Sequence, residues 1–228
     1  MARRLLWACA LLAMTATATS ARSASARPEG AVLFSEVIEV LDFAAPVAAG
    51  QSVSVRFPVG ELEVVADAVE GVRTELEIRC RKLSEALCAK YSRRLRLDAV
   101  ERDGAVEVRL AGLPKWKLRK LQLDGVVTVP DWAPLAVHVG VGDVEIHAGR
   151  RDLGVRMGIG DLTIHVPQDR VRSVRAATGI GDASLHGAIQ RDGARRRLLG
   201  ARLDWAEGSG SVDIALGLRI GDARVVLE

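Results

Sequence analysis

Three of the four histidines in the chain recur at one fixed distance from an aspartate. Each lies four residues after its aspartate, in the pairs Asp143/His147, Asp161/His165 and Asp182/His186. Neutral imidazole nitrogens are common ligands of Zn²⁺ and Cu²⁺. If the three repeats stack as neighbouring β-strands, the imidazoles form an outward-facing column with a spacing of about 4.8 Å. The column predicts either a row of solvated rings, which we favour, or an open and weak metal site.

Stacked imidazoles have a second chemistry. Each imidazolium would repel the next, so such a column resists protonation and could respond to a pH of about 6. Glu145 is the one carboxylate that the repeats place close by as a further ligand. A metal- or pH-responsive envelope protein is therefore an alternative function.

The aspartates of the same repeats also have more than one interpretation. Stacked carboxylates could bridge a cation, but we expect each to accept hydrogen bonds from the amides of its own turn. Asp143 and Asp161 are the candidate pair for a glycan-active enzyme, because two carboxylates on one face can hydrolyse a sugar chain. The sequence has no Gly-x-Ser-x-Gly motif, and only 4% of its residues are aromatic. We therefore expect a non-enzymatic protein without a cofactor.

The glycines before these aspartates predict a turn of the backbone. Gly-x-Gly-Asp occurs three times, with a related turn near the end of the sequence, at Gly140/Gly142/Asp143, Gly158/Gly160/Asp161, Gly179/Gly181/Asp182 and Gly221/Asp222. Strands follow these glycines, whereas a dinucleotide-binding motif needs a third glycine that opens a helix. The spacing also differs from that of nonapeptide calcium repeats.

The elements around each turn position its polar residues. Apolar residues alternate before each turn and shift by one position after it. Alternation marks a half-buried strand, and the shift would turn later side chains outward unless the backbone turned a corner there. Glycine permits such a corner. Repeated strand–corner–strand units predict an all-β fold, a β-solenoid of stacked coils in which the last two corners could instead form a hairpin.

Other segments extend this architecture. A further strand–corner–strand unit is expected around Gly60, one short helix at residues 83–91 and a hairpin around Asp103 and Gly104. Residues 208–211 and 219–222 predict two more corners. The predicted organisation is a signal peptide at 1–26, an N-terminal leader at 27–50 and a β-solenoid domain at 51–228.

The signal peptide is predicted from its charge and hydropathy. Arg3 and Arg4 precede a short apolar run, and small residues follow up to Ala26, the expected cleavage site. Ala18 and Ala21 are alternative sites. No later segment is apolar and long enough to span a bilayer. We expect an exported protein, periplasmic or on the cell surface.

Two cysteines, Cys80 and Cys88, remain after the signal peptide. An even number of cysteines in an exported chain predicts a disulfide. The two lie eight residues apart, at the end of a predicted strand and inside the predicted short helix. The alternative is a pair of buried thiols.

The charge argues against a general nucleic-acid partner. The chain has 32 basic and 29 acidic residues, and the signal peptide holds three of the arginines, which leaves 29 of each. Residues 79–120 are locally basic, with 13 basic against five acidic residues. Their cluster of Lys115, Lys117, Arg119 and Lys120 could contact an anionic polymer or lipid. The simpler interpretation, which we favour, is a solvated face paired with acidic N-terminal strands.

Taken together, these motifs resemble the toastrack domain, a bacterial family also known by the name "putative adhesin". The likeness rests on the Gly-x-Gly-Asp corners, on Val129-Pro130 before the first central repeat and on the N-terminal unit at 57–64. It covers roughly residues 53–228. Arg219 and Ser211 depart from the glycine and aspartate of the pattern. The resemblance implies an exported, non-catalytic β-solenoid that binds an unknown envelope or surface ligand.

Overall fold

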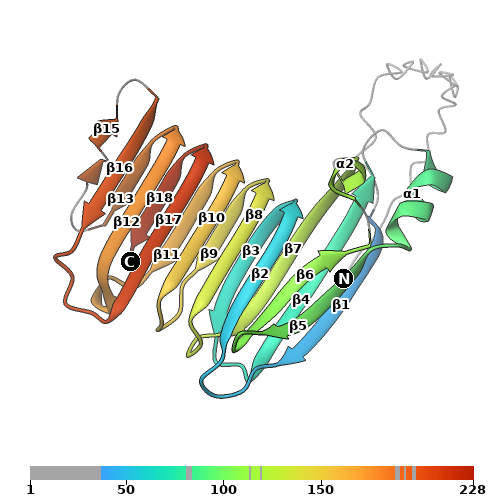
Figure 1. Cartoon of the computed structure of the whole chain (residues 1–228), viewed down its shortest axis with the longest axis horizontal. Coiled ribbons are helices and arrows are strands. Elements are labelled where there is room, and N and C mark those ends of the chain that lie inside the picture. Colours follow the sequence, from blue (N-terminus) through green and yellow to red (C-terminus); the bar gives the residue numbers. More distant parts are fainter. Residues whose placement is uncertain are drawn as a thin grey trace, which may run out of the picture. The chain divides into compact units, whose positions relative to one another are not determined.

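Apolar residues alternate with polar ones along most of the chain, and these stretches form the strands of two sheets (Figure 1). The structure is a computed structural model that describes residues 37–80, 84–112, 114–118, 120–187, 191–192, 194–196 and 199–228. All of them belong to one structural unit, Ser35–Glu228. The predicted signal peptide lies outside the described residues.

Within these ranges each sheet has nine strands and mixes parallel with antiparallel pairs. Sheet A contains, in spatial order, β1 (Val37–Pro46), β4 (Gly71–Cys80), β7 (Leu121–Pro130), β3 (Glu61–Asp67), β9 (Val144–His147), β11 (Leu162–Val166), β18 (Ala223–Leu227), β13 (Ala183–His186) and β14 (Arg191–Asp192). Sheet B contains β15 (Ala194–Arg196), β16 (Gly200–Trp205), β12 (Val171–Ile180), β17 (Val212–Ile220), β10 (Leu153–Ile159), β8 (Leu135–Val141), β2 (Ser52–Val59), β6 (Ala105–Ala111) and β5 (Arg96–Arg102). The helices are α1 (Glu85–Ser92), α2 (Lys115–Leu118) and a 3₁₀ turn at Gln168–Arg170.

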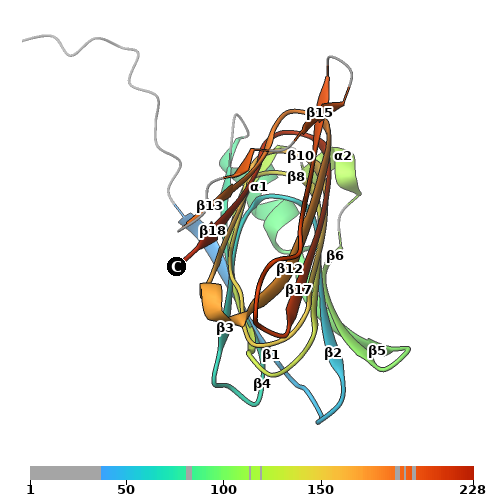
Figure 2. The same ribbon diagram turned by 90° about the vertical axis from the view of Figure 1, so that its left-hand side faces the viewer.

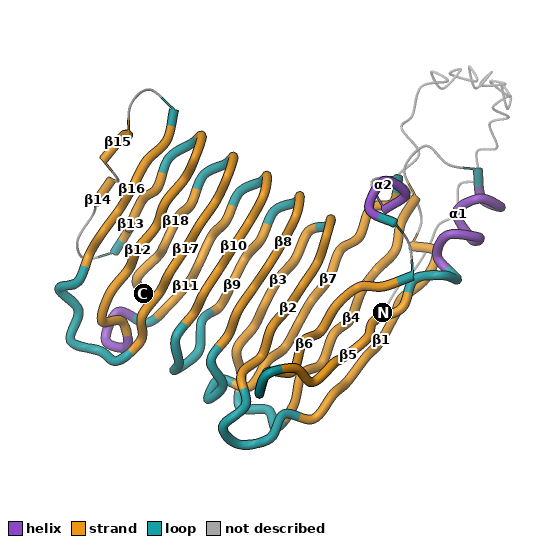
Figure 3. The backbone as a smooth tube through the Cα atoms, in the orientation of Figure 1, coloured by secondary structure: helices purple, strands orange, loops and turns teal. Residues whose placement is uncertain are grey.

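The two sheets lie face to face, and their inward side chains form one core (Figure 2). Inward residues such as Val137 on sheet B and Ile146 on sheet A are 0% exposed. Helices contribute little and loops lie mainly at the strand ends (Figure 3). The predicted all-β class is therefore confirmed, although α2 was not expected.

Glycine corners join the two sheets. We call each sheet B strand, corner and sheet A strand a corner unit; the described units are β2–β3, β8–β9, β10–β11, β12–β13 and β17–β18. At Gly142 and Gly160 the φ angles are 142° and 133°, where glycine is favoured. A Cβ added at Gly142 would lie 1.8 Å from the carbonyl oxygen of Gly60, and one at Gly160 1.8 Å from that of Gly142. Neighbouring corners therefore pack backbone against backbone.

The first glycine of each Gly-x-Gly-Asp corner is also closely packed. An added Cβ would lie 2.2–2.6 Å from a carbonyl oxygen of the adjacent corner unit at Gly140, Gly158 and Gly179. These three glycines have no positive φ. Space rather than backbone conformation therefore requires glycine there.

The corner units do not stack in the order of the chain. The last unit, β17–β18, lies between β10–β11 and β12–β13. β17 pairs in parallel with β10 and β12, and β18 pairs in parallel with β11 and β13. The predicted histidine column assumed that the three central repeats are direct neighbours, and the C-terminal unit interrupts that order because it lies beside β10–β11.

The corner at Gly181 shows the consequence of this order. Its φ of 123° fits the predicted turn, but stacking in chain order would set Gly181 against Gly160. Instead, a Cβ added at Gly181 would lie 2.2 Å from the carbonyl oxygen of Gly221, and one at Gly221 1.9 Å from that of Gly160. The corner at Gly221 therefore lies between the corners at Gly160 and Gly181. On its other side, the Gly181 N–H donates to the Leu199 carbonyl at 3.1 Å.

Polar contacts hold the start of β17 to β12. The Arg172 guanidinium and the Ser173 hydroxyl both donate to the Asp213 carboxylate, the hydroxyl at 2.6 Å. The hydrogen bond from Arg172, and to a smaller extent the one from Ser173, lowers the pKa of Asp213 to about 2. The carboxylate is therefore ionised near neutral pH and can accept both donors.

Two further expectations change. Residues 37–46 of the predicted leader form β1, which pairs antiparallel with β4 and so belongs to sheet A. Residues 208–211 do not form a corner between the sheets, because they connect β16 to β17 within sheet B. There the amides of Gly210 and Ser211 donate to the carbonyl groups of Val171 and Arg170.

Other expectations hold. The helix expected at 83–91 is α1, and β5 and β6 form the hairpin around Asp103 and Gly104. The corner of β17–β18 has the same positive φ at Gly221 as the other corners. Arg219 stands where the Gly-x-Gly-Asp corners have their first glycine, and it has no positive φ.

At four of the five described corners, the apolar residue directly before the positive-φ glycine is exposed rather than buried. These residues lie side by side along the corners and are 38–48% exposed: Val141, Ile159, Ile220 and Ile180. The alternating pattern of each strand would place these residues among the buried ones. The chain turns toward the other sheet at this point, so the facing sheet no longer covers them.

Candidate functional site

The strand order brings together two of the three predicted histidines. His147 on β9 and His165 on β11 are directly paired, and their rings stack with centroids 5.0 Å apart. His186 pairs with Val226, which also pairs with His165. The ring of His186 instead contacts the Ser184 hydroxyl at 3.0 Å. The predicted column of three imidazoles is therefore wrong, because Val226 occupies its middle.

Carboxylates surround the His147–His165 pair. Glu145 Oε1 lies 3.6 Å from His147 Nε2 and 3.3 Å from His165 Nε2. Glu228 Oε1 lies 3.0 Å from His165 Nδ1. In the described part of the chain, no three histidine, cysteine or carboxylate side chains are arranged as a metal site. Metal binding by the pair stays a prediction.

The corner aspartates form a chain of hydrogen bonds between corner units. The backbone N–H of Asp161 donates to the Asp143 carboxylate at 3.0 Å, and that of Asp222 to the Asp161 carboxylate at 3.0 Å. The N–H of Asp182 donates to the Asp222 carboxylate at 2.8 Å. We expected each carboxylate to bind amides of its own turn, and this is corrected because the donor belongs to the adjacent unit.

Cys80 at the end of β4 and Cys88 in α1 form a disulfide, with their Cα atoms 6.1 Å apart. The predicted bridge is therefore confirmed. It ties α1 to the end of β4.

The basic cluster predicted around α2 is described only in part. Lys117 is half-buried, and its ammonium lies 5.3 Å from the centre of the Tyr91 ring. Lys120 is exposed. The side chain of Lys115 and all of Arg119 lie outside the described residues. Contact of this segment with an anionic surface stays a prediction.

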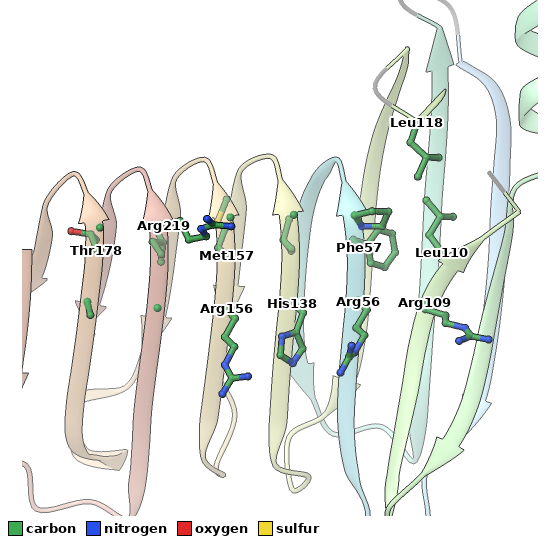
Figure 4. A pocket seen from close by; sticks show the side chains of 18 residues that line it. Arg56, Phe57, Arg109, Leu110, Leu118, His138, Arg156, Met157, Thr178 and Arg219 are labelled. Carbon is green, nitrogen blue, oxygen red and sulfur yellow. The ribbon is translucent and has the colours of Figure 1, made fainter. Parts of the chain in front are cut away.

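A groove on the outer face of sheet B contains a row of basic side chains (Figure 4). Its volume is about 910 Å³. The parallel register sets Arg56 beside both Arg109 and His138, and sets His138 beside Arg156. Four neighbouring strands therefore present a cation or an imidazole at one level. We call the groove with Arg109, Arg56, His138 and Arg156 the basic groove.

Acidic side chains neutralise this row only in part. Glu107 pairs with Arg56 at 2.8 Å. Among the described residues, Arg109 and Arg156 have no ion-pair partner within 4.0 Å. Burial is the largest cause that lowers the pKa of His138, and the charges of Arg56 and Arg156 lower this pKa further. The charge of Glu107 raises it. Like charges side by side destabilise a sheet, so the row costs stability in the absence of a ligand.

The floor of the groove includes bare backbone. Gly217 pairs with Arg156 and Ala177, and Gly154 lines an adjoining hollow of about 600 Å³. A Cβ added at either glycine would meet no heavy atom within 4 Å, and neither has a positive φ. The fold therefore does not require glycine at these positions. Glycine inside a strand weakens it and often marks the close approach of a ligand.

The outer face of sheet A has the opposite charge. Carboxylates gather over β3, β4, β7 and β9, from Glu61, Glu63, Glu75, Glu77, Asp124 and Glu145. Arg79 pairs with two of them, Glu77 and Asp124. The acidic residues near the N-terminus and the basic groove thus belong to opposite faces.

Sequence reasoning missed the basic groove. The signal is present, because Arg56, His138 and Arg156 each lie four residues before the positive-φ glycine of a corner. Aligning the outward positions of the repeats would have placed these three in one row. Arg109 would not have been found, because β6 belongs to no corner unit.

Of the helices among the described residues, none combines the length and the apolar character needed to cross a membrane. No protein-family model matches the sequence, and no match to a curated protein was found.

Solved structures that are similar to the chain include three bacterial proteins. A "putative cell adhesion protein" from Clostridium sporogenes is 11% identical with a TM-score of 0.48, over 83% of this chain and 100% of that one. A "putative adhesin" from Parabacteroides merdae is 6% identical with a TM-score of 0.33, over 82% and 81%. Another from Bacteroides fragilis is 9% identical with a TM-score of 0.28, over 83% and 98%. At these identities and TM-scores the likeness does not carry a function to this chain.

Proposed function

We propose that the chain is an exported, non-enzymatic binding protein with an adhesin-like role at the cell envelope, in the periplasm or on the cell surface. In this proposal its stacked corner units are a β-solenoid of the toastrack type. The Cys80–Cys88 disulfide supports export, since such bonds persist mainly in oxidising compartments. The signal-like segment at residues 1–26 supports it independently.

The observation that carries the proposal is the basic groove on sheet B. Arg109 and Arg156 lack ion partners there and are exposed, which suits attraction of an anionic partner. The carboxylates that could serve a glycan-active enzyme, Asp143 and Asp161, accept backbone hydrogen bonds at the corners. That structural use favours binding over catalysis. Activity on a polysaccharide panel that disappears in Asp143→Asn would reverse the preference.

Cosedimentation of the full chain with an envelope preparation tests the proposal. We expect the wild type to bind and the double variant Arg109→Ser/Arg156→Ser to bind much less. The control, Arg73→Ser/Arg224→Ser, removes two exposed arginines from sheet A and is expected to bind like the wild type. Equal binding by the two double variants, or no binding by the wild type, would contradict the proposal.

The His147–His165 pair favours a second candidate, a metal-responsive envelope protein. With rotation of their side chains, the two imidazoles and the carboxylates of Glu145 and Glu228 offer nitrogen and oxygen donors to Zn²⁺ or Cu²⁺. Calorimetric titration with Zn²⁺ is expected to detect binding that is lost in His165→Ala and kept in His186→Ala. The same heat from both variants would reject this candidate.

A further inference from the structure

The basic groove and its continuation extend over more strands than a small ligand needs. From β6 the row crosses β2, β8, β10, β17 and β12 to β16, which is six steps within the described sheet. At about 4.8 Å a step, the row is roughly 29 Å long. Its members in spatial order are Arg109, Arg56, His138, Arg156, Gly217, Ala177 and Arg202. A ligand that used the whole row would be an extended chain lying across the strands.

The side chains of the row select oxyanions. Guanidinium groups bind carboxylates, sulfates and phosphates through paired hydrogen bonds. Arg175 and Arg219 border the groove and its adjoining hollow, and neither has an ion-pair partner within 4.0 Å among the described residues. The charge of Arg175 acts on Asp213, however, and Arg202 is paired with Asp204 at 2.7 Å. A bound polyanion would also relieve the repulsion between neighbouring cations.

The shape and lining of the groove favour a sugar polymer among polyanions. Apart from the imidazole of His138, the aromatic side chain in the described lining is Phe57, which is 3% exposed. Nucleic-acid bases therefore find no aromatic ring on which to stack other than the half-buried imidazole of His138. The cations lie along a recess with bare backbone at Gly217, which admits a chain more readily than a flat lipid surface.

We propose that the basic groove binds a linear anionic polysaccharide that crosses the strands. Its carboxylates pair with Arg109 and Arg156, and its sugar rings lie over Gly217 and Ala177. The proposal rests on the proposed function and names the ligand class of the same groove.

Titration of the full chain with polygalacturonate, a linear polymer of acidic sugars, tests the charge contacts. We expect binding by the wild type at low ionic strength that weakens as salt is added. Arg109→Ser/Arg156→Ser is expected to lose about tenfold or more in affinity. Arg73→Ser/Arg224→Ser, with the same change of net charge on the other sheet, should bind like the wild type. Equal losses in both double variants would overturn the proposal.

A variant that keeps every charge tests the floor of the groove. Gly217→Leu places a side chain in open space, so the fold should tolerate it. We expect an unchanged or higher urea midpoint together with weaker polygalacturonate binding. Wild-type affinity in this variant would overturn the placement of the sugar chain.

Other probes distinguish the polysaccharide from other ligands that could fill the groove. The methyl-esterified polymer, which lacks the charges, should not bind. Binding of polyphosphate or of vesicles of anionic phospholipid without binding of polygalacturonate would overturn the polysaccharide assignment. So would self-association of the wild type that Arg109→Ser/Arg156→Ser abolishes, because the acidic face of a second copy would then fill the groove.

The outcomes also distinguish this inference from the proposed function. Groove-dependent binding to envelope without binding to polygalacturonate would remove the inference and keep the function. Absence of binding to both envelope and polygalacturonate would contradict both the inference and the proposed function.

Discussion

Replacing a corner glycine tests why the corner units fit together. At Gly160 the φ angle is 133°, and an added Cβ would lie 1.8 Å from the Gly142 carbonyl oxygen and 2.6 Å from the Met157 methyl carbon. An L-residue in such a backbone conformation costs about 1–3 kcal/mol. Moving the neighbouring corner to relieve the overlap costs about 1–3 kcal/mol more. We therefore expect Gly160→Ala to lower the free energy of unfolding by about 2–6 kcal/mol, a large share of a typical domain's stability.

Gly154→Ala is the matched control on the same corner unit. It makes the same chemical change where a Cβ meets nothing within 4 Å and φ is not positive. Alanine restricts the unfolded chain more than glycine, so this variant should gain about 0.5–1 kcal/mol. Urea unfolding followed by circular dichroism measures both variants. If Gly160→Ala is as stable as Gly154→Ala, close backbone packing at the corners is not what requires glycine.

Three further predictions concern single contacts. Asp161→Ala should lower the free energy of unfolding by about 1–2 kcal/mol, and Asp161→Asn by less, because the amide oxygen can still accept from the Asp222 N–H; equal losses would count against the hydrogen-bond chain. Cys88→Ser should cost about 2.5 kcal/mol, and reductant should destabilise the wild type but not the variant; wild-type stability unaffected by reductant would contradict this. The pKa of His138 is lowered in the fold, so the unfolded chain binds the proton more readily. Stability should therefore fall as the pH drops through the ordinary histidine value of 6.5, and urea midpoints should fall less in His138→Gln; parallel pH profiles would contradict the assignment.

Local chemistry made the strands and corners predictable. Alternation of apolar residues defines a half-buried strand, and a glycine with a phase shift marks the place where the chain changes sheets. The Asp103–Gly104 hairpin and the Cys80–Cys88 bridge depend on residues near in sequence. Their physical causes can therefore be read from short segments.

The order of the units depends on long-range pairing, which short segments do not encode. Each unit offers similar parallel edges, so nothing local indicates that β17–β18 lies beside β10–β11. That single difference separates His186 from His165 and determines which N–H groups donate to the carboxylates of Asp161 and Asp222. The exposure of Ile159 also follows from the corner's place at the edge of the core, which alternation alone does not reveal.

The most direct test of binding through sheet B is an arginine footprint. The full chain would be treated with an arginine-selective reagent, with and without the envelope preparation, and the modified sites identified by mass spectrometry. We predict that envelope protects Arg109 and Arg156 of the basic groove and leaves Arg73 and Arg224 on sheet A equally reactive. Protection of the sheet A arginines alone, or uniform reactivity of all four, would contradict the account.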